Sequence, residues 1–176
     1  FSFLANRWKE ESTSWDYPQI VRNHIQREYS MLDMDTGGGE ILSSCMPLPQ
    51  NTYAMEGYLP NVPVAKNRLG PLGVKIVQVW GNDILPFADD YFDLVTNRHG
   101  SFLAHGLHRI IRPGGLFITQ QVGGENNFKL NQLLQEKPEF IYSHWTLNLA
   151  GKQLTAAGFQ ILEQKDEYPE TTVSDI

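Results

Sequence analysis

Three consecutive glycines at positions 37–39 are the feature that most constrains this chain of 176 residues. They follow a short apolar run that ends in Asp33 and Asp35, and they precede Ile41 and Leu42. Glycine tolerates positive φ and has no Cβ, so such a turn lets a ligand approach the backbone closely. In open α/β sheets, a glycine turn between a strand and a helix marks the nucleotide-binding edge. We therefore expect a nucleotide-like ligand at this turn.

The spacing around the turn disfavours two common classes of nucleotide-binding protein. A dinucleotide-binding fingerprint needs G-x-G-x-x-G, and Leu42 occupies the place of its third glycine. A phosphate-binding P-loop needs a lysine before serine or threonine, and no lysine occurs between Lys9 and Lys66. A nicotinamide-dependent dehydrogenase and a P-loop enzyme are therefore both poor interpretations.

Helical and strand-like patterns alternate along most of the chain. Short apolar runs predict strands at residues 30–34, 51–55, 74–79, 92–95, 116–122 and 159–168. Helical spacing, with start and stop residues, predicts helices at residues 16–29, 40–45, 62–69, 101–111, 127–136 and 147–157. Residues 1–15 mix aromatic and charged side chains, and we interpret residues 1–30 as an N-terminal helical cap.

Composition and charge indicate one ordinary globular domain. The chain is 41% hydrophobic and 19% charged. Its 20 acidic and 14 basic side chains give a net charge of −6 without a Lys/Arg cluster, which disfavours a nucleic-acid partner. Cys45 is the single cysteine, so a reducing, cytoplasmic location is expected. No apolar run approaches membrane-spanning length, so no membrane partner is expected. The chain starts at Phe1 without methionine or leader, as a trimmed or partly observed segment would.

Four motifs follow one another along the chain. The first is the acidic glycine turn with Asp33, Gly37 and Gly39, and the second is Glu56 after the second predicted strand. The third is the run LPFADDYFDLV at residues 85–95, and the fourth is a turn with the sequence R-P-G-G at residues 112–115. Together they resemble the class I S-adenosylmethionine-dependent methyltransferases, whose motif I is an acidic residue followed by G-x-G-x-G, and the third is similar to a run of the type 11 methyltransferase group. The resemblance covers roughly residues 16–168.

The resemblance implies a fold, a cofactor and a set of cofactor-binding residues. The fold is α/β and Rossmann-like, a mostly parallel twisted sheet with helices on both faces, in a single domain over residues 1–176. The cofactor is S-adenosylmethionine, and its expected contacts are Asp33, Asp35, Gly37, Gly39, Glu56, Asp83, Ile84 and Asn97.

These residues are expected to contact different parts of the cofactor. A carboxylate about 20 positions beyond the glycine turn, here Glu56, can accept hydrogen bonds from both ribose hydroxyls. Asp83, with Asn82 as the alternative, is expected to bind the adenine amino group, while the Ile84 N–H faces the ring. Trp80 either stacks on the adenine or simply packs in the core.

The expected catalytic residues are Asn97, Arg98 and His99, which follow the fourth predicted strand. Ligands of such sheets bind at the carboxyl ends of the strands, so these side chains should face the transferred methyl group. His99 is a general base, a residue that lines the pocket, or a cap for the next helix. No metal is expected, because no cysteine or acidic side chain is spaced to complete a site with His105 and His108.

The chain departs from the family pattern in two places. Asp35 stands where the first glycine of motif I is usual, so either the loop shifts or cofactor binding is altered. After residues 159–168 the chain ends before the family's last antiparallel strand, so we expect that this strand is absent or that the sequence is truncated at its C-terminus.

The activity implied by the resemblance is methyl transfer from S-adenosylmethionine to a nucleophilic acceptor. The sulfonium already activates the methyl group, so catalysis can consist largely of alignment. The acidic balance favours a small-molecule acceptor over nucleic acid. The alternatives are a methyltransferase acting on RNA and a non-catalytic S-adenosylmethionine-binding protein of the same fold.

Overall fold

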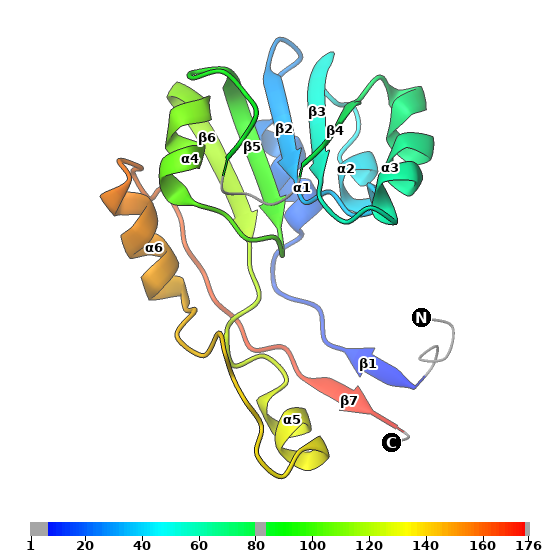
Figure 1. Cartoon of the computed structure of the whole chain (residues 1–176), viewed down its shortest axis with the longest axis vertical. Helices are drawn as coiled ribbons and strands as arrows, with labels where there is room; N and C mark the ends of the chain where they lie inside the picture. The colour runs from blue at the N-terminus through cyan, green and yellow to red at the C-terminus, as the bar shows by residue number, and fades with distance from the viewer. Residues whose placement is uncertain (1–6, 80–83, 175–176) are drawn as a thin grey trace.

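A five-stranded parallel sheet forms the centre of the computed structural model, which describes residues 7–79 and 84–174 (Figure 1). All four pairs of neighbouring strands are parallel. In spatial order the strands are β4 (Lys75–Gln78), β3 (Asn51–Glu56), β2 (Ser30–Met34), β5 (Phe92–Arg98) and β6 (Ile111–Gln120). The predicted α/β, Rossmann-like fold is confirmed, and the strand order reverses between β2 and β5.

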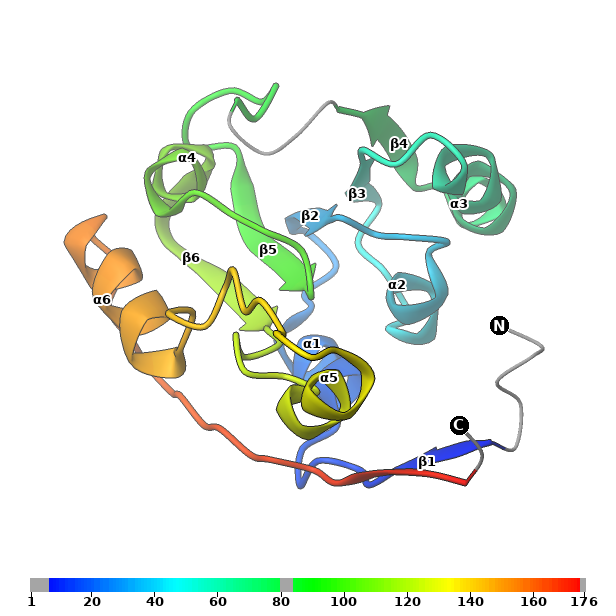
Figure 2. The same ribbon diagram turned by 60° about the horizontal axis from the view of Figure 1, so that its bottom comes forward.

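Helices cover both faces of this sheet. On one face lie α1 (Tyr17–His24), α2 (Glu40–Ser44) and α3 (Asn61–Leu69), and α3 runs into a 3₁₀ turn at Gly70–Leu72. On the other face lies α4 (Ala104–Ile110), with α6 (Leu147–Ala156) packed beside it toward β6 (Figures 1 and 2). Successive strand residues point to opposite faces. Met31 therefore joins the core under α1–α3, and Leu32 joins the core under α4.

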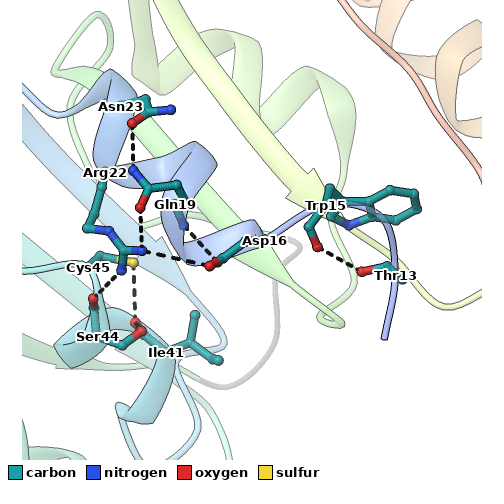
Figure 3. A network of polar contacts seen from close by, with 9 residues as sticks. All are labelled: Thr13, Trp15, Asp16, Gln19, Arg22, Asn23, Ile41, Ser44 and Cys45. Atoms are coloured by element: carbon teal, nitrogen blue, oxygen red, sulfur yellow. Dashed lines mark hydrogen bonds and ion pairs between the residues drawn. The ribbon is translucent and has the colours of Figure 1, made fainter. Parts of the chain in front are cut away.

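Side-chain hydrogen bonds anchor α1 beside α2 (Figure 3). The carboxylate of Asp16 caps α1 by accepting a hydrogen bond from the Gln19 N–H at 2.9 Å, which satisfies one of the free donors of the first turn. Arg22 donates from Nη1 to the carbonyl of Ser44 at 2.7 Å, where α2 ends. Tyr17 is buried beneath, and its hydroxyl donates to a carbonyl of β6 at 3.3 Å. The predicted helix start at Asp16 is confirmed.

The L-P-F…F-D run has a structural role at the amino ends of the strands. Asp93 accepts a hydrogen bond from the Ser30 N–H at 2.7 Å and forms an ion pair with Arg112 at 2.9 Å. Arg109 of α4 donates to the carbonyls of Phe87 and Leu85, at 2.7 and 2.8 Å. This run therefore ties β2, β5, α4 and β6 together at the edge opposite the glycine turn.

The R-P-G-G turn is a bulge near the beginning of β6. Ile111 pairs with Phe92 and Leu116 with Leu94, so residues 112–115 stand opposite a single residue of β5. A Cβ on Gly115 would lie 3.1 Å from the Asp93 carbonyl oxygen, which explains a glycine at this position. The predicted turn is therefore present, inside the strand rather than before it.

The predicted helix over residues 1–15 is wrong in its described part. Trp8–Glu10 is instead a strand, β1, which pairs antiparallel with β7 (Thr171–Val173) away from the main sheet (Figures 1 and 2). Residues 9–14 are all charged or hydroxyl side chains and have no apolar stripe to bury as a helix. Pairing with β7 instead supplies backbone hydrogen bonds to Trp8–Glu10.

The predicted strand at residues 159–168 is also wrong, because this segment forms no strand. Phe159 and Ile161 pack against the core, but the same alternation then reaches Glu163 and Lys165, which form an exposed ion pair at 2.8 Å. A strand needs a continuous apolar face, and this one ends after two residues.

One more helix lies outside the layers around the sheet. The helix α5 (Phe128–Leu134) lies in the segment that leaves the carboxyl end of β6 and hangs below the sheet in Figure 1. None of the helices in the described ranges has the length and apolar character needed to span a bilayer.

Candidate active site

The glycine turn is a loop at the carboxyl edge of the sheet, between β2 and α2. The Thr36 N–H donates to the Met55 carbonyl at 3.0 Å, which holds the loop against β3. The Ser43 N–H donates to the Gly39 carbonyl at 2.9 Å and closes the first turn of α2. The loop therefore lies beside the point where the strand order reverses, which is the ligand-binding position of open α/β sheets.

Two glycines of this loop need positive φ, for different reasons. Gly39 has φ +81°, and a Cβ there would lie 2.6 Å from Leu69 Cγ, so its absence lets α3 pack against the loop. Gly37 has φ +62°, and a Cβ there would meet no atom within 4 Å. Packing does not demand glycine at position 37. Its bare backbone instead leaves space at the loop surface, as expected for a ligand cradle.

Asp33 is a buried carboxylate between β2 and β5. Its side chain is 6% exposed and accepts a hydrogen bond from Thr96 Oγ1 at 2.7 Å. Burial raises the pKa of Asp33 to about 6, because desolvation outweighs this hydrogen bond, and the nearby Asp35 carboxylate adds to the increase.

Asp35 keeps the backbone conformation of a glycine. Its φ is +51°, so the loop has not left the left-handed region to accommodate a side chain. The side chain reaches toward the residues that follow β5, where a Cβ on Gly100 would overlap the Asp35 carboxylate. The Asp35 side chain is thus accommodated by a second glycine rather than by a shift of the loop.

Glu56 ends β3 and is 4% exposed. Its Oε1 accepts a hydrogen bond from the Tyr58 N–H at 2.7 Å, and its Oε2 accepts a longer one from Asn61 Nδ2 at 3.4 Å. A carboxylate has about four acceptor positions, so these bonds orient the group and leave capacity for a ligand.

Asn97 is fully buried near the carboxyl end of β5. Its Oδ1 accepts a hydrogen bond from Gln121 Nε2 at 2.7 Å, and the same Nε2 donates to Thr119 Oγ1 at 2.7 Å. Among the described residues, nothing accepts a hydrogen bond from Asn97 Nδ2. A buried donor without a partner costs stability, so the position fits a polar group supplied by a ligand.

Arg98 and His99 follow Asn97 in the chain. Arg98 is half-buried, whereas His99 is exposed and has φ +65°. The His99 N–H donates to the Gln120 carbonyl at 2.9 Å, which holds the residue beside β6. Partial desolvation, together with the positive charge of Arg98, lowers the pKa of His99.

Of the residues predicted to lie near the adenine, only Ile84 belongs to the described part of the chain. Asp83, Asn82 and Trp80 lie outside the described residues. Ile84 is described, and its side chain is 83% exposed. Its expected N–H contact with the adenine ring stays a prediction.

A small cavity of about 200 Å³ joins several of the predicted residues. It is lined by Asp33, Met34, Asp35, Thr36, Gly37, Glu40, Ile41 and Arg98. Glu56, Asn97 and His99 lie at the same edge of the sheet but do not line it. A larger open groove of about 730 Å³ runs between α6 and residues 161–164, and it contains none of the predicted site residues.

Sequence reasoning missed the roles of Gln121, Gly100 and Thr96. Each contacts a predicted residue from another strand or loop, so spacing along the chain carries no signal for it. Within residues 7–79 and 84–174, no group of three histidine, cysteine or acidic side chains is arranged to hold a metal ion. His108 instead packs edge-on against Phe159, with ring centroids 5.4 Å apart.

A family model for the methyltransferase domain matches residues 32–119, half of the chain. The chain belongs to the methyltransferase-domain family. The match runs from β2 to β6 and contains the glycine loop, Glu56 and the residues at the end of β5. The protein is therefore a class I methyltransferase, an enzyme whose cofactor is S-adenosylmethionine.

Solved structures of low sequence identity share the fold of this methyltransferase. A Haloferax volcanii protein assigned as a methyltransferase, solved in complex with the Trm112 methyltransferase activator, is 17% identical, with a TM-score of 0.68 over 85% of this chain and 70% of its own. An assigned methyltransferase of Bacillus halodurans is 21% identical, with a TM-score of 0.68 over 83% and 70%. An S-adenosylmethionine-dependent methyltransferase of Aquifex aeolicus is 21% identical, with a TM-score of 0.59 over 81% and 79%. Comparison with curated protein sequences gave no significant match.

Proposed function

We propose that this methyltransferase methylates a small molecule that enters over the carboxyl end of β5. The observation that carries the proposal is the charge of the cavity, whose lining includes three carboxylates (Asp33, Asp35 and Glu40) and one guanidinium (Arg98). The chain as a whole carries −6. A nucleic-acid substrate brings phosphates, which such a surface repels, whereas neutral or cationic small molecules meet no such barrier.

The cofactor end of the site would be held by the residues of the glycine loop and by Glu56. S-Adenosylmethionine supplies the activated methyl group when bound. Asp33, Asp35, Gly37 and Gly39 would surround its amino-acid part. Glu56, oriented by the Tyr58 N–H at 2.7 Å, would accept hydrogen bonds from the ribose hydroxyls. Asp83, Ile84 and Asn97 complete the proposed cofactor set.

The acceptor end would be formed by Asn97, Arg98 and His99. The Nδ2 of Asn97 is a buried donor without a partner in the described part of the chain, and it would donate to an oxygen or nitrogen lone pair of the acceptor. A lowered pKa keeps the His99 imidazole neutral at pH 7, so its ring nitrogen can accept a proton from the acceptor. Alignment of the acceptor remains the larger part of catalysis in this proposal.

Radiolabelled methyl transfer tests this proposal. The protein is incubated with S-adenosylmethionine labelled in the methyl group and with either a small-molecule extract or purified RNA. We expect label in the small-molecule fraction and none in RNA. Label that RNase releases from the RNA fraction would instead support the RNA alternative.

Calorimetry tests the cofactor part of the proposal separately. Binding of S-adenosylmethionine without label transfer to any fraction would contradict the proposed class of acceptor. Absence of binding would contradict the proposed cofactor-binding residues.

A further inference from the structure

Asp35 joins the two walls of the proposed site. It lies in the glycine loop after β2, and its carboxylate packs against Gly100, two residues beyond the end of β5. It holds φ +51° although it has a side chain. Positive φ at a residue other than glycine costs energy and is enriched at functional sites. Asp35 also lines the small cavity, to which β5 contributes Arg98.

Two further carboxylates line the same cavity. Glu40 forms an ion pair with Arg68 of α3. Asp33 is buried and accepts a hydrogen bond from Thr96 at 2.7 Å. With Asp35, the cavity lining includes three carboxylates and one guanidinium, that of Arg98.

We propose that Asp35 is a specificity-determining residue, which makes the site bind the charged sulfonium cofactor more tightly than its neutral thioether product. S-Adenosylmethionine carries an ammonium and a sulfonium against one carboxylate, and loss of the methyl group leaves S-adenosylhomocysteine with no net charge. A carboxylate between the glycine loop and β5 favours the cation. The inference rests on the proposed cofactor site and deepens it by assigning the loop carboxylate a function.

A purely steric role predicts a different pattern. If the Asp35 side chain only fills the space left by Gly100, its charge is irrelevant and both ligands respond equally to its removal. The ammonium is common to both ligands, so a contact with it would also change both dissociation constants equally. The ratio of the two constants therefore isolates an effect of Asp35 on the sulfonium.

The test compares dissociation constants for S-adenosylmethionine and S-adenosylhomocysteine by calorimetry in the wild type and Asp35→Asn. Asparagine has the same shape and tolerates positive φ, so the loop should keep its conformation. A matched control is Asp90→Asn. Asp90 is also an aspartate at positive φ (+53°), and it is exposed in the turn before β5, at the opposite edge of the sheet. Both variants change the net charge by the same amount.

We expect Asp35→Asn to weaken S-adenosylmethionine binding about 4- to 16-fold, from Coulomb's law for charges ~5 Å apart at an effective dielectric of about 40–80. Binding of S-adenosylhomocysteine should stay within about twofold, and Asp90→Asn should change neither. Equal changes for both ligands, or none, in Asp35→Asn would overturn the inference while leaving the cofactor site intact. Failure of the wild type to bind either ligand would instead contradict the proposed cofactor site.

Discussion

Replacing Asp33 with asparagine should make the stability of the protein less dependent on pH. Asp33 lies between β2 and β5 with 6% of its surface exposed. Asparagine keeps the shape and an oxygen that can accept the hydrogen bond from Thr96 Oγ1, which is 2.7 Å long in the wild type. It removes only the ionisable group. The difference between the two proteins therefore isolates the cost of a buried negative charge.

The size and direction of this effect follow from the pKa of Asp33. Its ordinary value is 3.8, and burial raises it to about 6 in the folded protein. The fold thus favours the protonated acid. The resulting stabilisation is complete below about pH 3.8 and is lost as the pH rises through 6. The folded and ordinary pKa values of Asp33 differ by about two units, which corresponds to about 3 kcal/mol in the free energy of unfolding.

Urea unfolding of both proteins between pH 4 and pH 8 measures this effect. The free energy of unfolding of Asp33→Asn, relative to that of the wild type, should rise by about 3 kcal/mol from pH 4 to pH 7 and then stay constant. Other carboxyl groups titrate in both proteins and cancel in the difference. Curves that stay parallel over the whole range would refute a raised pKa at Asp33.

Three further predictions concern the same edge of the sheet. Glu56→Gln should weaken S-adenosylmethionine binding by about 1–3 kcal/mol in calorimetry, because a charged acceptor is lost; unchanged affinity would remove Glu56 from the site. Gly39→Ala should lower the free energy of unfolding by about 1–3 kcal/mol, since its Cβ would lie 2.6 Å from Leu69 Cγ at φ +81°. The same measurement on Gly37→Ala, which meets no atom within 4 Å, gives the cost of positive φ alone. His99→Ala should leave cofactor affinity unchanged and lower methyl transfer about 10²–10⁴-fold if His99 is a base. In the wild type, activity should then rise with pH below the ordinary histidine range, because the pKa of His99 is lowered; a flat profile would leave alignment as the mechanism.

Local sequence patterns correctly predicted several of the strands and helix ends that position the site. The predicted strand at residues 30–34 coincides with β2, because a short apolar run fits a buried strand and the glycines that follow permit the turn that ends it. Asp16 was predicted to start α1, and its side chain caps that helix. Glu56 was predicted to end the second strand of the sheet, and β3 ends there. In each case the signal and the structure lie within a few residues of each other.

The segments that local patterns misjudged depend on partners far away in the chain. Trp8–Glu10 is a strand because β7 pairs with it, and nothing within residues 1–15 indicates this. Residues 159–168 alternate like a strand, but their apolar face ends at Ile161, so the sheet gains no sixth member. Whether an extended segment joins a sheet is decided by the surface available to cover it.

The sequence by itself determined the family, the parallel sheet and the positions of the glycine loop and Glu56, because these depend on backbone conformation and local apolar periodicity. Only the tertiary structure decided which side chains meet across the strand ends. Asp35 packs against Gly100, and Gln121 holds the amide of Asn97 at 2.7 Å. These contacts exist because parallel strands bring their carboxyl ends to one edge, so residues far apart in the chain become neighbours there.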